Sequence, residues 1–125
     1  MPDAALDFDH ILRANLQRVF NERDDTTRAA AVAELYVADP VMYEPDAIVT
    51  GRAAISATAG ALLDRFGADF TFVPVAPAVG HHGTGALRWQ AGPKGGAIAV
   101  TGTDVAEIVE GRIARLWVLL DPPAA

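Results

Sequence analysis

The chain has 125 residues, of which 51% are hydrophobic, and its 16 acidic against 10 basic side chains give a formal net charge of -6. This length predicts one domain over residues 1–125, while the acidic balance and the scattered basic residues argue against nucleic acid as a partner. The absence of cysteine excludes disulfides, thiolate chemistry and sulfur-ligated zinc, and the lack of a long apolar run or a basic leader predicts a soluble, cytoplasmic protein with no membrane span.

Three helices are predicted in the first half of the chain. Residues 8–20 carry one apolar stripe with helical spacing, and Asp7 or Asp9 can cap the start of this helix. A shorter helix is expected next, capped by Thr26 or Thr27 and stopped by Pro40, with the short β-prone segment "VMY" after it. The third, "TGRAAISATAGALLDRF", has its apolar residues on one side and ends at Gly67, a typical C-terminal cap.

The second half is β-prone. Four strands are predicted at "FTFVPVAPAV", "TGALRWQA", "GAIAVTGTDVAEIV" and "RIARLWVLL", joined by turns at "GHHG", "GPKGG" and "EG". Pro74 and Pro77 cannot donate to a ladder, so the first of these strands is expected at an edge or with a bulge. Helices followed by a meander of strands predict an α+β fold, with the helices packed on one face of a curved antiparallel sheet.

Asp104 is the most informative single residue. Strand alternation places it on the same face as Gly102 and Ala106, so a carboxyl shares a face with small or apolar groups. Burial would raise its pKa and make it a proton donor or acceptor near neutral pH. The alternatives are that this face is wet, or that the carboxyl caps a neighbouring backbone group.

A second pair of acids, Glu44 and Asp46, flanks Pro45 in "VMYEPD". Acids beside proline are common in exposed turns, which is the simpler interpretation. Glu44 gains a chemical role only if it faces the same cavity as Asp104. Two acids in different surroundings can then divide the acid and base roles between them.

Other conspicuous residues favour structural roles. His81 and His82 lie in a hairpin turn, and adjacent histidines on an extended chain point to opposite faces, so we expect no metal site there. Trp89 and Trp117 are expected in the core, on a pocket wall or at a subunit interface. The "GPKGG" segment lacks the spacing of a phosphate loop and joins two strands. We therefore expect neither a metal nor a cofactor.

The order of these segments resembles the nuclear transport factor 2-like superfamily, and within it the SnoaL-like and ketosteroid isomerase branch. Two helices, "YVADPVMYEP", a helix opening with "GRAAI", and strands containing "HHGTGA", "TDV" and "GRI" carry the resemblance, from about Ile11 to Asp121. It implies a cone-shaped α+β fold whose bent sheet encloses an apolar pocket. It also implies a homodimer joined through the outer face of the sheet.

The resemblance also implies roles for single residues. Glu44 falls at the general-base position of the isomerases. Asp104 falls at the position of the pocket carboxyl, which donates a hydrogen bond to an oxyanion or acts as the acid or base. Trp117 is expected to face outward, at the dimer interface. The pocket residues expected on this basis are Leu16, Phe20, Met42, Leu87, Trp89, Leu116 and Val118. His81 is a further candidate, which either swings into the mouth of the pocket or stays in the turn.

At two positions the sequence departs from the family pattern, which limits the activities that the resemblance implies. The first helix offers "NLQRVF" where the isomerases have a tyrosine, and Gly102 stands where limonene epoxide hydrolases have an arginine. Our first hypothesis is a cofactor-free isomerase, cyclase or hydrolase acting on a small apolar carbonyl compound or epoxide. The alternatives are a module that binds a small apolar molecule without turnover, and a dimeric interaction protein of the same fold.

Overall fold

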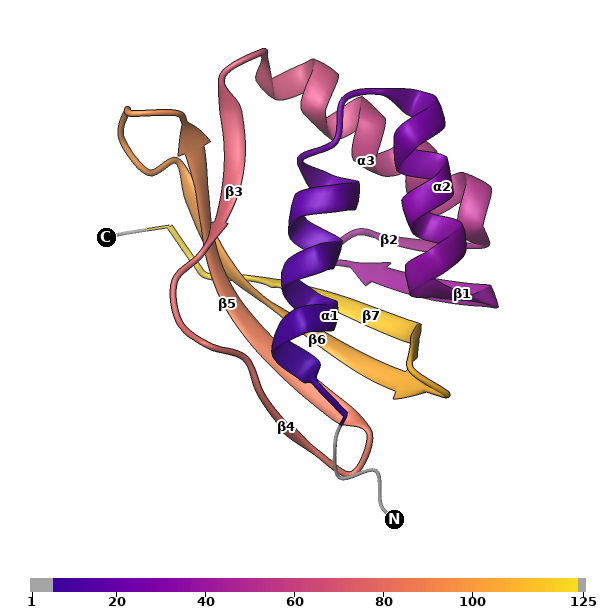
Figure 1. The fold of residues 1–125 in the computed structure, drawn as a ribbon. Coiled ribbons are helices and arrows are strands. Elements are labelled where there is room, and N and C mark those ends of the chain that lie inside the picture. The colour runs from indigo at the N-terminus through magenta and orange to yellow at the C-terminus, as the bar shows by residue number, and fades with distance from the viewer. Residues whose placement is uncertain (1–5, 124–125) are drawn as a thin grey trace.

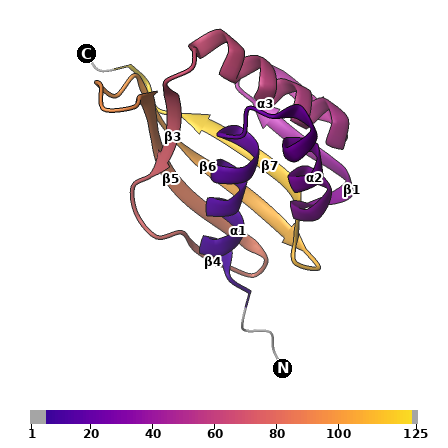
Figure 2. The same ribbon diagram turned by 45° about the horizontal axis from the view of Figure 1, so that its top comes forward.

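The computed structural model describes residues 6–123, whose fold is drawn in Figures 1 and 2. The helical elements are α1 (Phe8–Asn15), the π-helical segment η2 (Leu16–Phe20), α2 (Asp25–Leu35) and α3 (Arg52–Phe66). The strands are β1 (Tyr36–Glu44), β2 (Ala47–Thr50), β3 (Phe70–Pro74), β4 (Val79–His81), β5 (Thr84–Pro93), β6 (Val100–Val109) and β7 (Arg112–Leu120).

The strands of this region form one curved sheet in the order β2-β1-β7-β6-β5-β3, with β4 also paired to β5. The helices lie against its concave face, which confirms the predicted α+β fold (Figure 1). The sheet is mixed, whereas the strand pattern predicted an antiparallel one, because β1 runs parallel to β7. The two prolines of the first predicted strand do mark an edge, since β3 is the outermost strand and is separated from β4.

The first predicted helix forms over the apolar stripe, but it is α-helical only in its first part. Asp7 caps α1 by accepting a hydrogen bond from a backbone N–H of the first turn. From Leu16 onward the helix is π-helical, and it closes with a bond of 2.8 Å from Asn21 N to Leu16 O. The Asn21 side chain then bonds both the N–H and the carbonyl of Phe72, each at 2.8 Å. These two bonds join the end of η2 to β3.

The second helix differs from the prediction at both ends. Its cap is Asp24 rather than a threonine, and the Asp24 carboxylate accepts bonds from both N and Oγ1 of Thr27. The helix ends at Leu35 instead of near Pro40, because Tyr36 is already extended and pairs with β7. Pro40 lies within β1, at a register shift that takes this part of the strand out of the ladder.

The third helix ends as predicted. Gly67 adopts a positive φ of 97°, and its N–H bonds Leu63 O at 3.1 Å. The predicted turns at "GHHG", "GPKGG" and "EG" all join neighbouring strands. The strand predicted from Gly96 begins only at Val100, and Ala99 makes a single backbone bond to β5 before it.

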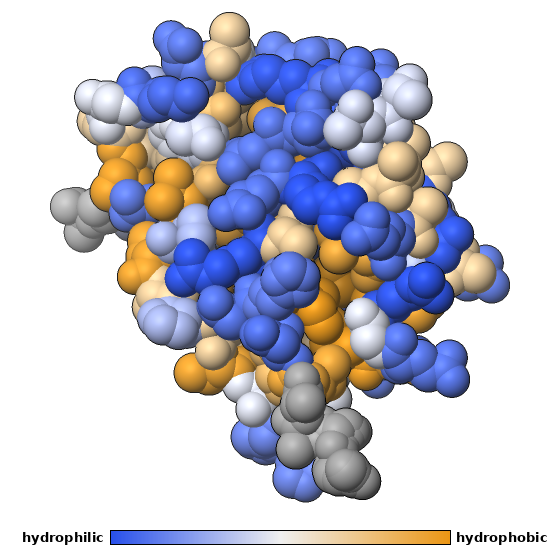
Figure 3. Space-filling view, in the orientation of Figure 1, coloured by the Kyte–Doolittle hydropathy of each residue, from blue (hydrophilic) through white to orange (hydrophobic). Residues whose placement is uncertain are grey.

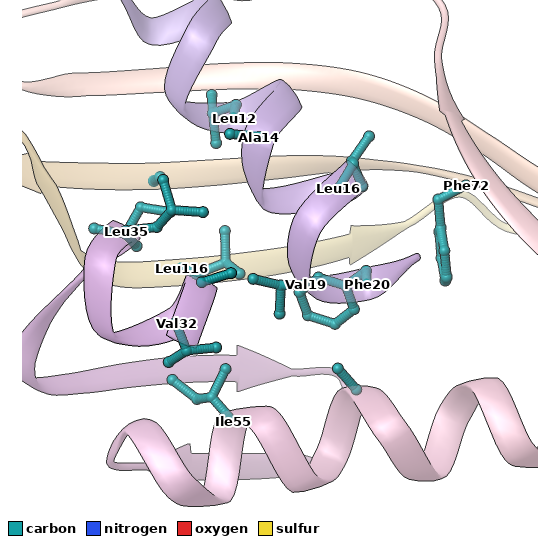
Figure 4. Close-up of a cluster of buried hydrophobic side chains, with 14 of the residues drawn as sticks. Leu12, Ala14, Leu16, Val19, Phe20, Val32, Leu35, Ile55, Phe72 and Leu116 are labelled. Carbon is teal, nitrogen blue, oxygen red and sulfur yellow. The ribbon is translucent and has the colours of Figure 1, made fainter. Parts of the chain in front are cut away.

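The hydrophobic core fills the space between the helices and part of the concave face. Side chains from each helix meet there with Leu116 of β7, and Val19, Val32 and Leu35 lie around it (Figure 4). Hydrophilic residues cover much of the outer side of the helices, with hydrophobic surface showing between them and along the sheet (Figure 3). Across residues 6–123, no helix is both long enough and apolar enough to span a membrane.

The link between η2 and β3 predicts a stability effect. Asn21→Ala removes two hydrogen bonds and leaves the Phe72 backbone unpaired in a half-buried place, so the free energy of unfolding should fall by about 1–3 kcal/mol. Urea unfolding followed by circular dichroism measures the change. Gln17→Ala, on the exposed side of η2, is the matched control and should change stability by less than ~0.5 kcal/mol. Equal effects in the two variants would contradict a structural role for Asn21.

Candidate active site

A cavity of about 750 Å³ lies between η2, α3 and the part of the inner sheet face that the core does not cover. Its lining includes residues of η2, the β1–β2 turn, α3 and β3, together with inner-face residues of β5, β6 and β7. Most of these side chains are apolar. Asp104 and Glu44 both line the cavity, so the two acids singled out from the sequence meet in one space.

Asp104 lies on the inner face of β6 and is only 3% exposed. Its neighbours on that face, Gly102 and Ala106, are also buried, as the strand alternation predicted. The indole Nε1 of Trp89 donates a hydrogen bond of 2.9 Å to Asp104 Oδ1. Burial raises the pKa of Asp104 to about 7, although the bond from Trp89 opposes the shift. Near neutral pH this carboxyl can therefore either give or take a proton.

The glycine at position 102 makes the Trp89 bond possible. The register of β5 and β6 places Trp89 opposite Gly102, while Asp104 lies two residues further along β6 on the same face. A Cβ atom on residue 102 would lie 2.6 Å from Cζ2 of the indole, closer than van der Waals packing allows. The indole therefore lies directly over the glycine, and from there its N–H reaches the carboxyl.

Glu44 occupies a different environment at the end of β1. It is half-buried, and burial raises its pKa; the negative charge of Asp46 adds to this effect and Arg65 opposes it. Asp46 and Arg65 also line the cavity. The cavity thus has a charged rim and, at its inner end, a single buried carboxyl. Burial therefore raises the pKa of both acids, and charged neighbours modify the pKa of Glu44 alone.

Aromatic rings form a continuous wall between these two ends. Phe66 stacks on Phe70 at 4.4 Å, Phe70 meets Phe72 edge-on at 5.5 Å, and Phe72 meets Trp89 edge-on at 5.3 Å. Phe20 of η2 also packs edge-on against Phe72, at 6.1 Å (Figure 4). The wall therefore leads from the rim to the tryptophan that holds Asp104, and it suits a flat, apolar ligand.

The predicted pocket residues divide into two groups. Four of them line the cavity: Leu16, Phe20, Trp89 and Val118. Three others, Met42, Leu87 and Leu116, are fully buried in the core and do not contribute to the lining. The resemblance placed them on the pocket wall, but the core covers that part of the inner face.

His81 does not reach the cavity. It is exposed at the end of β4, and its Nδ1 lies 2.8 Å from Nδ1 of His82. The two rings meet because His82 has a left-handed φ of 52° in the turn, which an extended chain would not have. The expectation that the two rings point to opposite faces was wrong for that reason. Within residues 6–123, no group of three or more His, Asp or Glu side chains is arranged to hold a metal ion.

Sequence reasoning missed several residues of the site. Phe66 and Arg65 were not singled out, although they lie in the last turn of α3 and line the cavity. It also missed a buried polar pair, Asn15 and Tyr36. The available signal was that Asn15 is a polar residue within the apolar stripe of residues 8–20.

Comparison with known proteins gives a family and a fold. The family model for the SnoaL-like domain matches residues 13–116. No curated protein matches the chain significantly in sequence. A proposed isomerase of the SnoaL-like family from Agrobacterium tumefaciens strain C58 is similar in structure, with a TM-score of 0.83 and 25% identity over 90% of this chain and 96% of that one.

Two more distant structures show the fold alone. A proposed polyketide cyclase from Sinorhizobium meliloti has a TM-score of 0.68 and 21% identity, covering 87% of this chain and 93% of that one. A proposed ketosteroid isomerase from Kribbella flavida has a TM-score of 0.67 and 18% identity, covering 94% of this chain and 82% of that one. The curved sheet with helices on its concave face is therefore common to all three.

The raised pKa of Asp104 predicts a pH-dependent stability. An unfolded aspartate has a pKa near ~3.9, so the folded chain holds this proton more tightly than the unfolded chain does. The free energy of unfolding should therefore fall as pH rises from about 4 to about 7, by about 4 kcal/mol at most, because one pKa unit corresponds to ~1.4 kcal/mol.

Asp104→Asn should lack this part of the pH dependence while keeping an acceptor for Trp89. Urea unfolding of both proteins at several pH values measures the difference, and the titration of all other carboxyls cancels in the comparison. Identical pH profiles would mean that the Asp104 carboxyl is solvated.

Proposed function

The chain belongs to the SnoaL-like domain family, and from this premise we propose that it is an acid–base enzyme acting on a small apolar carbonyl compound or epoxide. The observation that carries the proposal is one buried carboxyl in an open, apolar cavity, with a pKa of about 7. Isomerisation, cyclisation and hydrolysis of such compounds all need a proton to be moved at a defined atom. This carboxyl can move one without a cofactor.

Asp104 is proposed to act at the inner end of the cavity. A general acid or base works best when its pKa lies near the working pH, and it contributes about 10²–10⁴ to the rate. Trp89 holds Oδ1. The second carboxyl oxygen, Oδ2, is then the one that exchanges a proton with the substrate.

Glu44 is proposed as the complementary group at the rim. In the favoured assignment Glu44 takes a proton from the substrate and Asp104 gives one. Their different surroundings support this division, because Glu44 is half-buried beside charged groups whereas Asp104 is enclosed by apolar ones. The reverse assignment uses the same two residues, and the pH dependence of the single variants distinguishes them.

The cavity also fits the proposed substrate in size and character. About 750 Å³ lies within the ~300–1,000 Å³ typical of small-molecule sites, and the aromatic wall offers ring faces and edges to an apolar compound. The cavity is not filled by the side chains of the protein itself, which favours a ligand-binding role over a purely structural one. Binding without turnover is the second candidate, since the same lining would hold a ligand in either case.

The proposal predicts proton exchange at carbon. In D₂O, wild-type protein should speed deuterium incorporation next to the carbonyl of small cyclic ketones, and proton NMR follows this exchange directly in the ketone. Asp104→Asn and Glu44→Gln should each slow the exchange by about 10²–10⁴. Asp64→Asn, exposed on α3 and outside the cavity lining, is the control and should have little effect.

The outcome for the double variant Asp104→Asn/Glu44→Gln decides between the candidates. A loss of only a few-fold would contradict the enzyme hypothesis. If wild-type protein binds the ketone saturably but does not exchange its protons, and if Glu44→Gln leaves the ketone affinity unchanged, the protein is a binding module instead.

We also propose a homodimer formed through the outer face of the sheet. Trp117 lies on that face of β7, next to the inward-facing Leu116, and stacks on Tyr43 at 5.2 Å. Ile48 and Leu119 are large apolar side chains exposed on strands of the same sheet. Trp117→Lys should lower the mass found by sedimentation from that of a dimer to that of a monomer. A monomeric wild type at micromolar concentration would exclude this interface.

A further inference from the structure

The arginines of this chain have defined partners, with one exception. Of the nine arginines in the sequence, eight donate a hydrogen bond or form an ion pair within residues 6–123. Some of them pair with a carboxylate, as Arg18 does with Glu34, and others bond backbone carbonyls. Arg65 has neither kind of partner in that part of the chain, although it lines the cavity. Its N–H groups can therefore serve a ligand, whereas the other arginines hold parts of the fold together.

Phe66 holds this guanidinium at the mouth of the cavity. Both residues lie in the last turn of α3, and Cζ of Arg65 lies over the Phe66 ring, 5.3 Å from its centre. A cation at this distance is attracted by the negative face of the ring. The contact uses the flat face of the guanidinium and leaves the N–H groups at its edge for other partners. The position of the charge is thus fixed without loss of its donors.

The aromatic wall of the cavity leads from Asp104 to this guanidinium. It begins at Trp89, which bonds Asp104, and ends at Phe66, over which Arg65 lies. The ring-to-ring steps between Trp89 and Phe66 measure 5.3, 5.5 and 4.4 Å. A flat ligand that follows the wall with its carbonyl group at Asp104 therefore brings its opposite end to Arg65. Such a ligand needs more than one ring to reach both groups.

We propose that Arg65 binds a carboxylate group of the substrate, so that the substrate is an organic acid with a carbonyl or epoxide group at its other end. The guanidinium presents its donors as a planar fork, which matches the two oxygens of a carboxylate. Arg65 is a binding residue, which orients the substrate and takes no part in proton transfer. The inference rests on the proposed function, because it names the class of compound that this cavity selects.

The two acids at the rim make a cationic ligand the competing possibility. Glu44 and Asp46 line the mouth together with Arg65, and the charge of Arg65 acts on the pKa of Glu44. Neither acid forms an ion pair with Arg65 within residues 6–123, so the guanidinium is not neutralised there. An ammonium group at the outer end of the wall would meet this guanidinium over Phe66 and be repelled by it. The end of the wall therefore favours a carboxylate.

A series of three probes that differ only in charge tests the inference. 6-Acetyl-2-naphthoic acid has a ketone at one end of a flat ring system and a carboxylate at the other. Its carboxamide is neutral, and the analogue with an aminomethyl group at that position is cationic. Binding of each probe to the full chain is measured by calorimetric titration near neutral pH. Wild type should bind the acid most tightly and the amine least tightly, and the affinity for the acid should fall as salt is added.

The variant Arg65→Gln removes the charge and the planar fork from the rim. Its affinity for the acid should fall by about tenfold, between the values for an exposed ion pair and for a buried hydrogen bond to a charge. Its affinity for the carboxamide should not change. Arg65→Lys should recover only part of the loss, because an ammonium group lacks the fork. Lys94→Gln removes one positive charge from the exposed turn after β5, outside the lining, and is the matched control, with all three affinities unchanged.

Three results would overturn the inference. Unchanged affinity of Arg65→Gln for the acid would show that the guanidinium contacts only water, and an equal loss for acid and carboxamide would show that the substitution disturbs the wall. Tightest binding of the aminomethyl probe, or no binding of the acid by wild type, would exclude a carboxylate site. The proposed function is judged separately, by the exchange of small cyclic ketones, which have no charged end. Exchange that depends on Asp104 would leave the proposed function standing without Arg65.

Discussion

The hydrogen bond from the Trp89 indole to the buried Asp104 carboxyl is the interaction on which the site depends. A carboxyl this deeply buried must be hydrogen-bonded, neutral, or both. The bond exists because Gly102 leaves room for the indole and because the β5–β6 register brings the two side chains together on one face. A slip of one residue in either strand would turn its side chain to the outer face of the sheet.

The uneven covering of the sheet decides which inner-face residues become core and which become cavity. Leu87 of β5 and Leu116 of β7 lie in the core, whereas Trp89 and Val118, two residues further along these strands, line the cavity. Asp104, on β6 between them and opposite both Leu87 and Val118, also lines the cavity. The π-helical end of the first helix and its two bonds to β3 hold the cavity wall next to the core. The part of the inner sheet face under the helices therefore contributes to stability, and the uncovered part leaves room for a ligand.

Membership of the family limits the chemistry without choosing a reaction, because one fold supports several functions. The polar groups of this chain define what its cavity can do. The first helix has no tyrosine at the cavity, and its buried Asn15 accepts a hydrogen bond from Tyr36 within the core, while position 102 holds a glycine that accommodates Trp89. The acid at the inner end is thus supported by an indole and apolar walls, and the second acid, Glu44, remains at the rim.

The sequence by itself determined the three helices, most of the strands and which residues share a face with Asp104, because each follows from periodicity, proline or glycine within a short segment. It left open whether that face is buried. Only the tertiary structure decided that β1 begins at Tyr36 and runs parallel to β7, that His81 stays outside the cavity, and that Asn15 meets Tyr36. These features depend on contacts between residues far apart in the chain or on a turn of unusual backbone conformation. A local pattern can therefore place a side chain on a face, but only the packing of distant elements decides what that face encloses.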